Sequence, residues 1–172
     1  MNYHQYHAID VVNGLGTRCT LFVSGCVHQC RGCYNQRTWP LQAGKPYTEA
    51  LEAQIIADLN DERIPRRGLS LSGGDPLHPA NLATILSLVQ RVTKECQGKD
   101  IWLWTGYRLA ELNQQQQQVL AYIDVLIDGK FEKAQADPEL RWRGSANQTI
   151  HWLNAHSAPS VDDGNRRQCQ YL

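Results

Sequence analysis

Short apolar strands alternate with amphipathic helices through the middle of the chain, and this alternation constrains the fold more than any other feature. Strands are predicted at residues 8–12, 20–23, 69–72, 101–104 and 123–127, and helices at 47–60, 79–96 and 108–122. Thr48 is the predicted N-cap of the first helix, because a threonine oxygen can accept a hydrogen bond from the first helical turn. The order predicts a parallel sheet with crossover helices, and therefore an α/β fold.

The predicted strands end in residues that suit a binding site. Gly73-Gly74, Gly106 and Gly129 each follow a strand, and a segment with three cysteines follows Val23. In parallel sheets, ligands bind at the carboxyl ends of the strands. We therefore expect the chemistry of the protein to collect along one edge of the sheet.

Length and charge narrow the function classes. The chain has 172 residues, which suits one domain, and its 17 basic residues balance its 17 acidic ones,. That balance argues against a nucleic-acid or membrane-surface partner. The N-terminus has no signal-peptide pattern, so we expect a cytoplasmic protein with reduced thiols. We predict one domain over residues 1–154 and a polar, mobile tail over 155–172.

Three of the six cysteines lie within eight positions. Cys26, Cys30 and Cys33 have the spacing C-x3-C-x2-C in the segment FVSGCVHQCRGCYN. Closely spaced thiolates bind soft or borderline metals, and ordinary iron–sulfur clusters use four of them. A cluster held by only three thiolates leaves one iron without a protein ligand. The spacing therefore suggests a [4Fe-4S] cluster with one iron open to substrate.

Two other interpretations of the cysteine segment remain. His28 could complete a structural Cys3His zinc site, although zinc ligands usually come as two separated pairs. Cys30 and Cys33 also form a C-x-x-C pair that could act as a redox dithiol, but this leaves Cys26 without a role. The remaining cysteines are two predicted core residues, Cys19 and Cys96, and one in the tail, Cys169, to which we assign no role.

Two later motifs carry groups that suit a polar ligand. The carbonyls of Gly73 and Gly74 and the carboxylate of Asp75 can accept hydrogen bonds from an ammonium group, although G-G-D-P is also an ordinary turn sequence. Lys130 can pair with a ligand carboxylate while Asp128 orients it or a ribose. A surface turn with one charge pair is the alternative for these two residues.

The motifs, taken in order, resemble those of a known enzyme family. C-x3-C-x2-C after an early strand and G-G-D-P at a later strand end are similar to radical S-adenosylmethionine (SAM) enzymes. The resemblance narrows to the activating enzymes of anaerobic ribonucleoside-triphosphate reductase through five stretches: NGLGTRCTLFVSGCVHQCRGCYN, LSLSGGDPLHPAN, DIWLWTGY, DVLIDGKF and WRGSANQ. It extends from the N-terminus to about Asn154.

The resemblance implies a fold, a site and a reaction. The fold is an open partial (β/α) barrel. Cys26, Cys30 and Cys33 hold a [4Fe-4S] cluster, and the other implied contacts with SAM come from Gly73, Gly74, Asp75, Asp128 and Lys130, with Gly32, Cys33 and Tyr34 near the adenine.

The implied reaction is the reductive cleavage of SAM to methionine and a 5′-deoxyadenosyl radical, which generates a glycyl radical on the large reductase subunit. No side chain needs to act as an acid or base, and the implied electron donor is of the flavodoxin type. The alternatives are activation of another glycyl-radical enzyme, such as pyruvate formate-lyase, and a non-catalytic zinc-binding interaction module.

Overall fold

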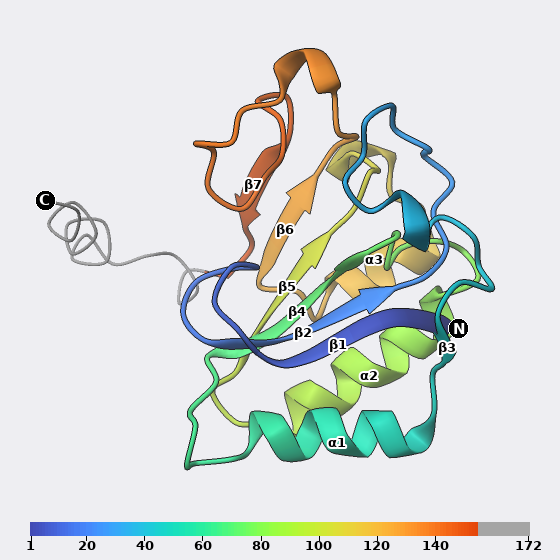
Figure 1. The fold of residues 1–172 in the computed structure, drawn as a ribbon. Coiled ribbons are helices and arrows are strands. Elements are labelled where there is room, and N and C mark those ends of the chain that lie inside the picture. Colours follow the sequence, from blue (N-terminus) through green and yellow to red (C-terminus); the bar gives the residue numbers. More distant parts are fainter. Residues whose placement is uncertain (155–172) are drawn as a thin grey trace, which may run out of the picture.

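A single mixed β-sheet organises the protein, and the computed structural model describes residues 1–154 (Figure 1). The spatial order of its seven strands is β3-β1-β2-β4-β5-β6-β7. The strands are β1 (Asn2–Asp10), β2 (Arg18–Val23), β3 (Lys45–Pro46), β4 (Gly68–Gly73), β5 (Asp100–Trp104), β6 (Val125–Asp128) and β7 (Thr149–Trp152). The helices are α1 (Glu49–Leu59), α2 (Leu82–Glu95) and α3 (Gln114–Leu120).

The four central strands are parallel, as predicted. β2 pairs with β4, β4 with β5, and β5 with β6, all in parallel, whereas β1 and β7 pair antiparallel with their neighbours. The α/β prediction is confirmed, and the sheet is open because β3 and β7 are its two edges. The parallel strands place their carboxyl ends along one side of the sheet, where the cysteine segment also begins.

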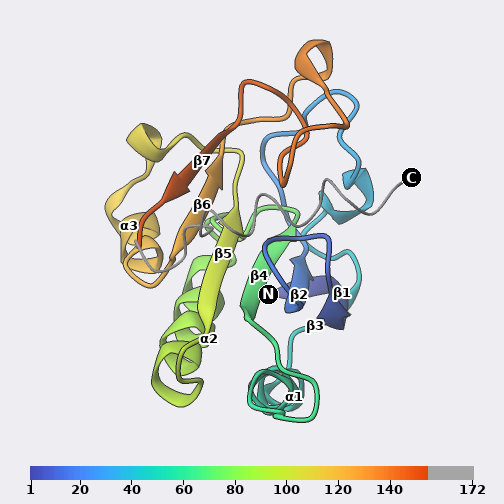
Figure 2. The same cartoon turned by 90° about the vertical axis from the view of Figure 1, so that its left-hand side faces the viewer.

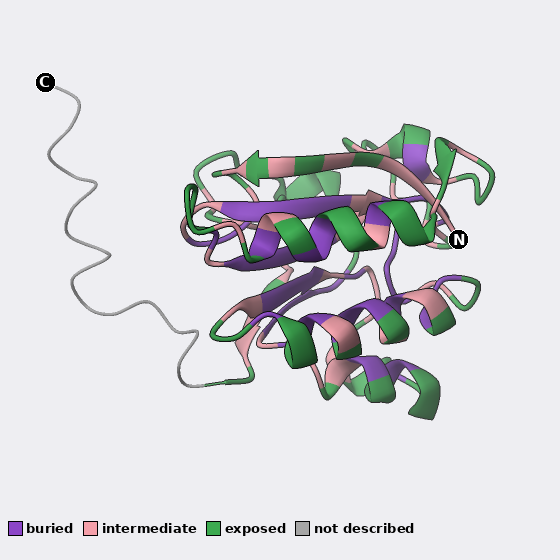
Figure 3. Ribbon diagram, turned by 90° about the horizontal axis from the view of Figure 1, so that it is seen from below, coloured by how far each residue is buried: buried purple, intermediate pink, exposed green. Residues whose placement is uncertain are grey.

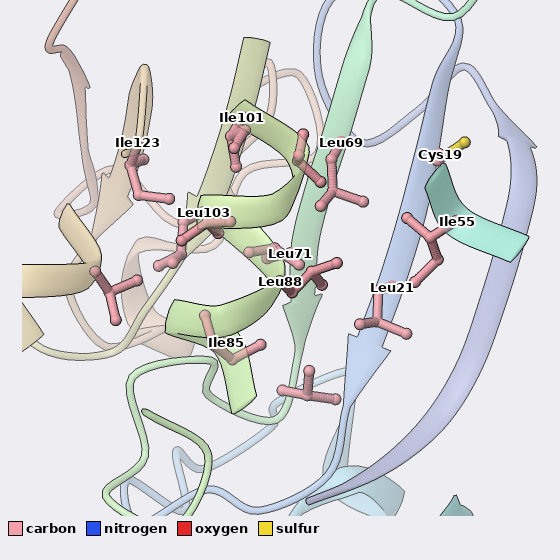
Figure 4. Close-up of a cluster of buried hydrophobic side chains, with 14 of the residues drawn as sticks. Cys19, Leu21, Ile55, Leu69, Leu71, Ile85, Leu88, Ile101, Leu103 and Ile123 are labelled. Atoms are coloured by element: carbon pink, nitrogen blue, oxygen red, sulfur yellow. The ribbon is translucent and has the colours of Figure 1, made fainter. Parts of the chain in front are cut away.

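The helices cover one face of this sheet (Figure 2). Strand residues alternate in direction, so every second side chain meets the helices. Leu69, Leu71 and Leu103 lie there beside α2, which contributes Ile85, and Leu21 lies beside Ile55 of α1 (Figure 4). Figure 3 shows that the helices turn their buried residues towards the sheet. Thr48 caps α1 as expected, since its side chain accepts a hydrogen bond from the Leu51 amide.

The opposite face carries a tryptophan cluster. Trp102 is fully buried, and the rings of Trp104, Trp142 and Trp152 lie within 6 Å of it, centroid to centroid. The guanidinium of Arg18 lies 5.1 Å from the centroid of the Trp102 ring and pairs with Asp100 at 2.6 Å. Arg18 is the first residue of β2 and Trp104 the last of β5, so these large side chains extend along this face towards the carboxyl ends of the strands.

Three expectations about elements need correction. The helix predicted at 108–122 is a 3-10 turn, Leu109–Glu111, followed by α3. Asn113 starts α3 as an N-cap that accepts a hydrogen bond from the Gln116 amide, so a new helix begins there,. The strand predicted at 8–12 is β1, which spans Asn2–Asp10, and the edge strands β3 and β7 were not predicted.

Two further expectations concern the chain as a whole. The predicted mobile tail, 155–172, and Cys169 within it lie outside the described residues. Within residues 1–154, no helix is long and apolar enough to cross a bilayer.

Candidate functional site

The cysteine segment leaves the carboxyl end of β2 and returns beside its own starting point. The amide of Gly25 donates to the carbonyl of Thr38 at 2.7 Å, and the amide of Cys26 donates to the carbonyl of Trp39 at 3.0 Å. These two bonds close residues 26–38 into a loop whose base is tied to the sheet. The loop therefore has a defined origin although it contains little regular structure.

Cys30 and Cys33 are the first and last residues of a tight turn. The amide of Cys33 donates to the carbonyl of Cys30 at 3.0 Å. Gly32 has a φ of +79°, as the third residue of a type II turn requires,. The C-x-x-C spacing and its internal glycine therefore produce a turn that brings the two cysteines to one end of the loop.

One cavity of about 390 Å³ brings together the cysteine loop and the strand ends. All three clustered cysteines line it, together with Gly73 and Gly74 after β4. The end of β5 adds Trp104, Thr105 and Gly106 to the wall, and the segment after β6 adds Gly129 and Trp142. Asn13, in the turn between β1 and β2, completes this part of the wall. The expectation that these motifs share one edge of the sheet agrees with this arrangement.

Gly73 and Gly74 occupy positions where a side chain would not fit. Gly73 has a φ of +102°, and a Cβ on Gly74 would lie 2.5 Å from the carbonyl oxygen of Gly25. The Gly74 amide donates to the carbonyl of Val23 at 2.8 Å. The double glycine thus lets the end of β4 pack directly against the base of the cysteine loop.

Asp75 lies behind the cavity wall and does not line it. Its side chain is fully buried and accepts hydrogen bonds from the amides of Leu77 and Gly106, at 2.8 and 3.1 Å. The hydroxyl of Thr105 lies 3.0 Å from both carboxylate oxygens. The carboxylate that we expected to meet a ligand is therefore occupied by protein donors, and only its neighbours Gly73 and Gly74 reach the cavity.

His28 joins the cysteine loop to this carboxylate. Its Nε2 lies 2.6 Å from Oδ2 of Asp75, and its ring packs edge-on against Tyr107, with 4.5 Å between centroids. Of the two ring nitrogens of His28, the residue that we considered as a zinc ligand, Nε2 is thus engaged with a carboxylate. No local sequence pattern marks this contact, since Asp75 is 47 positions away.

Neither Asp128 nor Lys130, at the end of β6, lines the cavity of the cysteines. Asp128 is buried, accepts a hydrogen bond from the Leu109 amide at 2.7 Å and lies 3.0 Å from Nε2 of His151. It lines a second cavity with these two residues, also of about 390 Å³, and not the cavity of the cysteines. Lys130 is exposed, and its positive charge partly opposes the rise that burial causes in the pKa of the Cys30 thiol.

Gly32 and Tyr34 flank Cys33 at the outer side of the loop. Tyr34 is fully exposed and lines the mouth of the main cavity, whereas Gly32 faces the stem of Lys133. Of the three residues expected near an adenine, Cys33 and Tyr34 therefore border the cavity.

Burial affects the thiols of the loop. Desolvation raises the pKa of Cys26 and of Cys30, and a backbone hydrogen bond from Phe131 partly opposes the rise at Cys30. Without a metal these thiols therefore favour the protonated form. Binding a metal centre would displace their protons, which couples occupancy of the site to pH.

Comparison with known proteins gives the family. The family model described as "4Fe-4S single cluster domain" matches residues 12–151. The chain is 73% identical to the anaerobic ribonucleoside-triphosphate reductase-activating protein of Vibrio cholerae, over 88% of this chain and 97% of that protein. It belongs to the family of anaerobic ribonucleoside-triphosphate reductase-activating proteins.

More distant relatives in this activating-protein family carry the same name. The Escherichia coli K12 protein is 65% identical, over 89% of this chain and 99% of its own length. The protein of enterobacteria phage T4 is 45% identical, over 90% of this chain and 95% of its own. The matched segments include the cysteine loop, the double glycine and the strand ends that surround the cavity.

Proposed function

We propose that this protein is a radical SAM activating enzyme that generates a glycyl radical on the large subunit of anaerobic ribonucleoside-triphosphate reductase. One observation carries the proposal. Cys26, Cys30 and Cys33 line one cavity with Gly73 and Gly74, although these two groups are some 40 positions apart in the chain. The name and the 4Fe-4S domain of the family support it from outside the structure.

The three cysteines suit a [4Fe-4S] cluster better than a single zinc ion. Four ligands around one zinc have sulfur atoms about 3.8 Å apart, because each Zn–S bond is about 2.3 Å long. Within residues 1–154, no three His, Cys, Asp or Glu side chains gather closely enough to hold one ion. Thiolates that bind separate irons of a cluster stand farther apart than the ligands of one zinc ion.

Groups in the cavity and beside it complement those of SAM. The Gly74 carbonyl has no hydrogen-bond donor among the described residues and suits the methionine ammonium group. We assign the carboxylate to Lys130 and the adenine to Cys33 and Tyr34, with Gly32 shaping the turn between them. Asp75 and Asp128 act from behind the wall, where they hold the ends of β4 and β6 in place.

The open sheet is the remaining part of the proposal. We propose that it corresponds to the partial barrel of radical SAM enzymes, with the tryptophan face as the interior. A bound [4Fe-4S] cluster would supply one electron for the cleavage of SAM to methionine and a 5′-deoxyadenosyl radical, and that radical would take a hydrogen atom from a glycine Cα of the reductase. In this proposal the chain positions SAM and shields it, and an external donor of the flavodoxin type reduces the cluster.

Anaerobic reconstitution followed by electron paramagnetic resonance (EPR) tests this function. The protein should bind about four irons per chain, and its reduced spectrum should change when SAM is added. Cys33→Ala should lose the four-iron signal, whereas Cys19→Ala, which alters a buried core thiol, should keep it. A colourless protein with one zinc per chain would support the interaction module instead.

A further inference from the structure

We propose that His28 is a positioning residue that sets where the cysteine loop stands relative to the SAM-binding edge of the sheet. This inference rests on the proposed function, because it concerns the distance between the cluster and its co-substrate. His28 lies between Cys26 and Cys30 in the chain, yet its side chain points back to the ends of β4 and β5. It is the one side chain between those cysteines that reaches the Asp75 carboxylate, among the described residues.

The His28 ring is held on several sides. Its side chain is only 5% exposed, and Nε2 lies 2.6 Å from Oδ2 of Asp75. Tyr107 meets the ring edge-on, and the backbone of Gly106 is so close that any Cβ there would overlap the imidazole. Gly106 is therefore a glycine because the histidine of a distant loop occupies the space of its side chain.

Asp75 connects this ring to the rest of the edge. Its carboxylate also accepts from the Gly106 amide, the Thr105 hydroxyl and the Leu77 amide. An ionised carboxylate only accepts hydrogen bonds, so the His28 tautomer that fits this contact is the one with its N–H at Nε2,. One buried carboxylate thus ties together the cysteine loop, the turn after β4 and the turn after β5.

This arrangement has a consequence for the chemistry. Asp75 directly follows Gly74, whose backbone we assign to the SAM ammonium group, while His28 lies two residues from each of two cluster ligands. The His28–Asp75 contact therefore links the two sides of the cavity that must grip the same co-substrate. A displacement of about 1 Å between reacting groups can cost on the order of a hundredfold in rate.

Two substitutions separate the parts of the contact. His28→Phe keeps a ring against Tyr107 and Gly106 but removes the donor to Asp75. His28→Gln keeps an N–H donor and removes the ring. Thr105→Val removes a second donor to the same carboxylate, and Thr93→Val, which removes a hydroxyl from α2, is the matched control.

The measurements are iron content, melting temperature, and the SAM concentration that half-converts the EPR spectrum of the reduced cluster. His28→Phe should bind about four irons but need about tenfold more SAM, Thr105→Val should shift the same way, and His28→Gln should recover most of the affinity. Thr93→Val should leave the half-converting SAM concentration unchanged, whatever its effect on the melting temperature. A role in general stability would lower the melting temperature without moving the SAM dependence.

The inference is overturned if His28→Phe binds SAM as the unmodified protein does. It is also overturned if His28→Phe fails to assemble a cluster that His28→Gln assembles, because the residue would then act in cluster assembly. A failure of the proposed function is distinct, since the unmodified protein itself would then show no SAM-dependent spectrum.

Discussion

Replacing Gly74 with alanine tests whether the double glycine supports the cysteine loop. An added Cβ would lie 2.5 Å from the Gly25 carbonyl oxygen and 3.0 Å from that of Thr38. Both are backbone atoms, so the loop base must move by roughly half an ångström before the closer contact becomes tolerable,. Gly25 directly precedes Cys26, so the movement reaches the first proposed cluster ligand.

The expected cost of Gly74→Ala is about 2 kcal/mol, in the range of overpacked interiors. For a chain of this size that corresponds to a fall of about 4–8 °C in melting temperature. We expect cluster content, measured as iron per chain after anaerobic reconstitution, to fall as well. Thermal unfolding by circular dichroism on the metal-free protein separates the two effects.

Gly98→Ala is the matched control. Gly98 has a φ of +67° and no atom within 4 Å of an added Cβ, so alanine there strains the backbone without a clash. It should cost about 1 kcal/mol and leave iron binding intact. If Gly74→Ala has the same melting temperature and the same iron content per chain as the unmodified protein, the end of β4 does not support the loop and our reasoning is wrong.

Three further predictions follow from other contacts. Cys26→Ser, Cys30→Ser and Cys33→Ser should each abolish the four-iron spectrum, whereas Cys96→Ala should retain it; loss of the cluster in Cys96→Ala would refute the three-cysteine assignment. Asp100→Asn should destabilise the fold by about 3 kcal/mol in urea unfolding, because it leaves the buried charge of Arg18 uncompensated, and a change below 1 kcal/mol would contradict this,. Hydrogen bonds from the Arg63 side chain and backbone lower the pKa of Asp61 to about 2. The ionised Asp61 carboxylate therefore stabilises the fold fully above its unfolded pKa of 3.8, and this contribution should be lost as the pH falls towards 2,. In the Arg63→Ala variant, the titration midpoint of Asp61 measured by NMR should move back towards 3.8, and an unchanged midpoint would contradict this.

The central strands were predictable because their signal is local. β2, β4 and β5 are short apolar runs that end in glycine or at the cysteine segment, and the structure moves their bounds by only a few residues. α3 was predicted too long because its first turn reads as continuous helix. The N-cap at Asn113, three residues before a glutamine that completes a capping box, was the available sign of a new start,.

Sequence reasoning grouped residues that the structure only partly brings together, since the three cysteines line one cavity with Gly73 and Gly74 whereas Asp75, Asp128 and Lys130 do not line it. Asp128 follows Leu126 by two positions on β6, and Leu126 packs on the helix side of the sheet. The alternation of strand residues therefore placed Asp128 on that side, away from the cysteines, which sequence reasoning did not use. The contact between His28 and Asp75 joins distant segments, and only the fold reveals it.

The most direct test of the central claim is the radical itself. Anaerobic incubation of the reconstituted protein with reductase, SAM and a strong reductant should give an EPR signal of a glycyl radical on the reductase, with methionine and 5′-deoxyadenosine as products. Replacing the target glycine of the reductase with alanine should erase that signal. The account is contradicted if the signal persists in that variant, or if it arises equally well with pyruvate formate-lyase as the only partner.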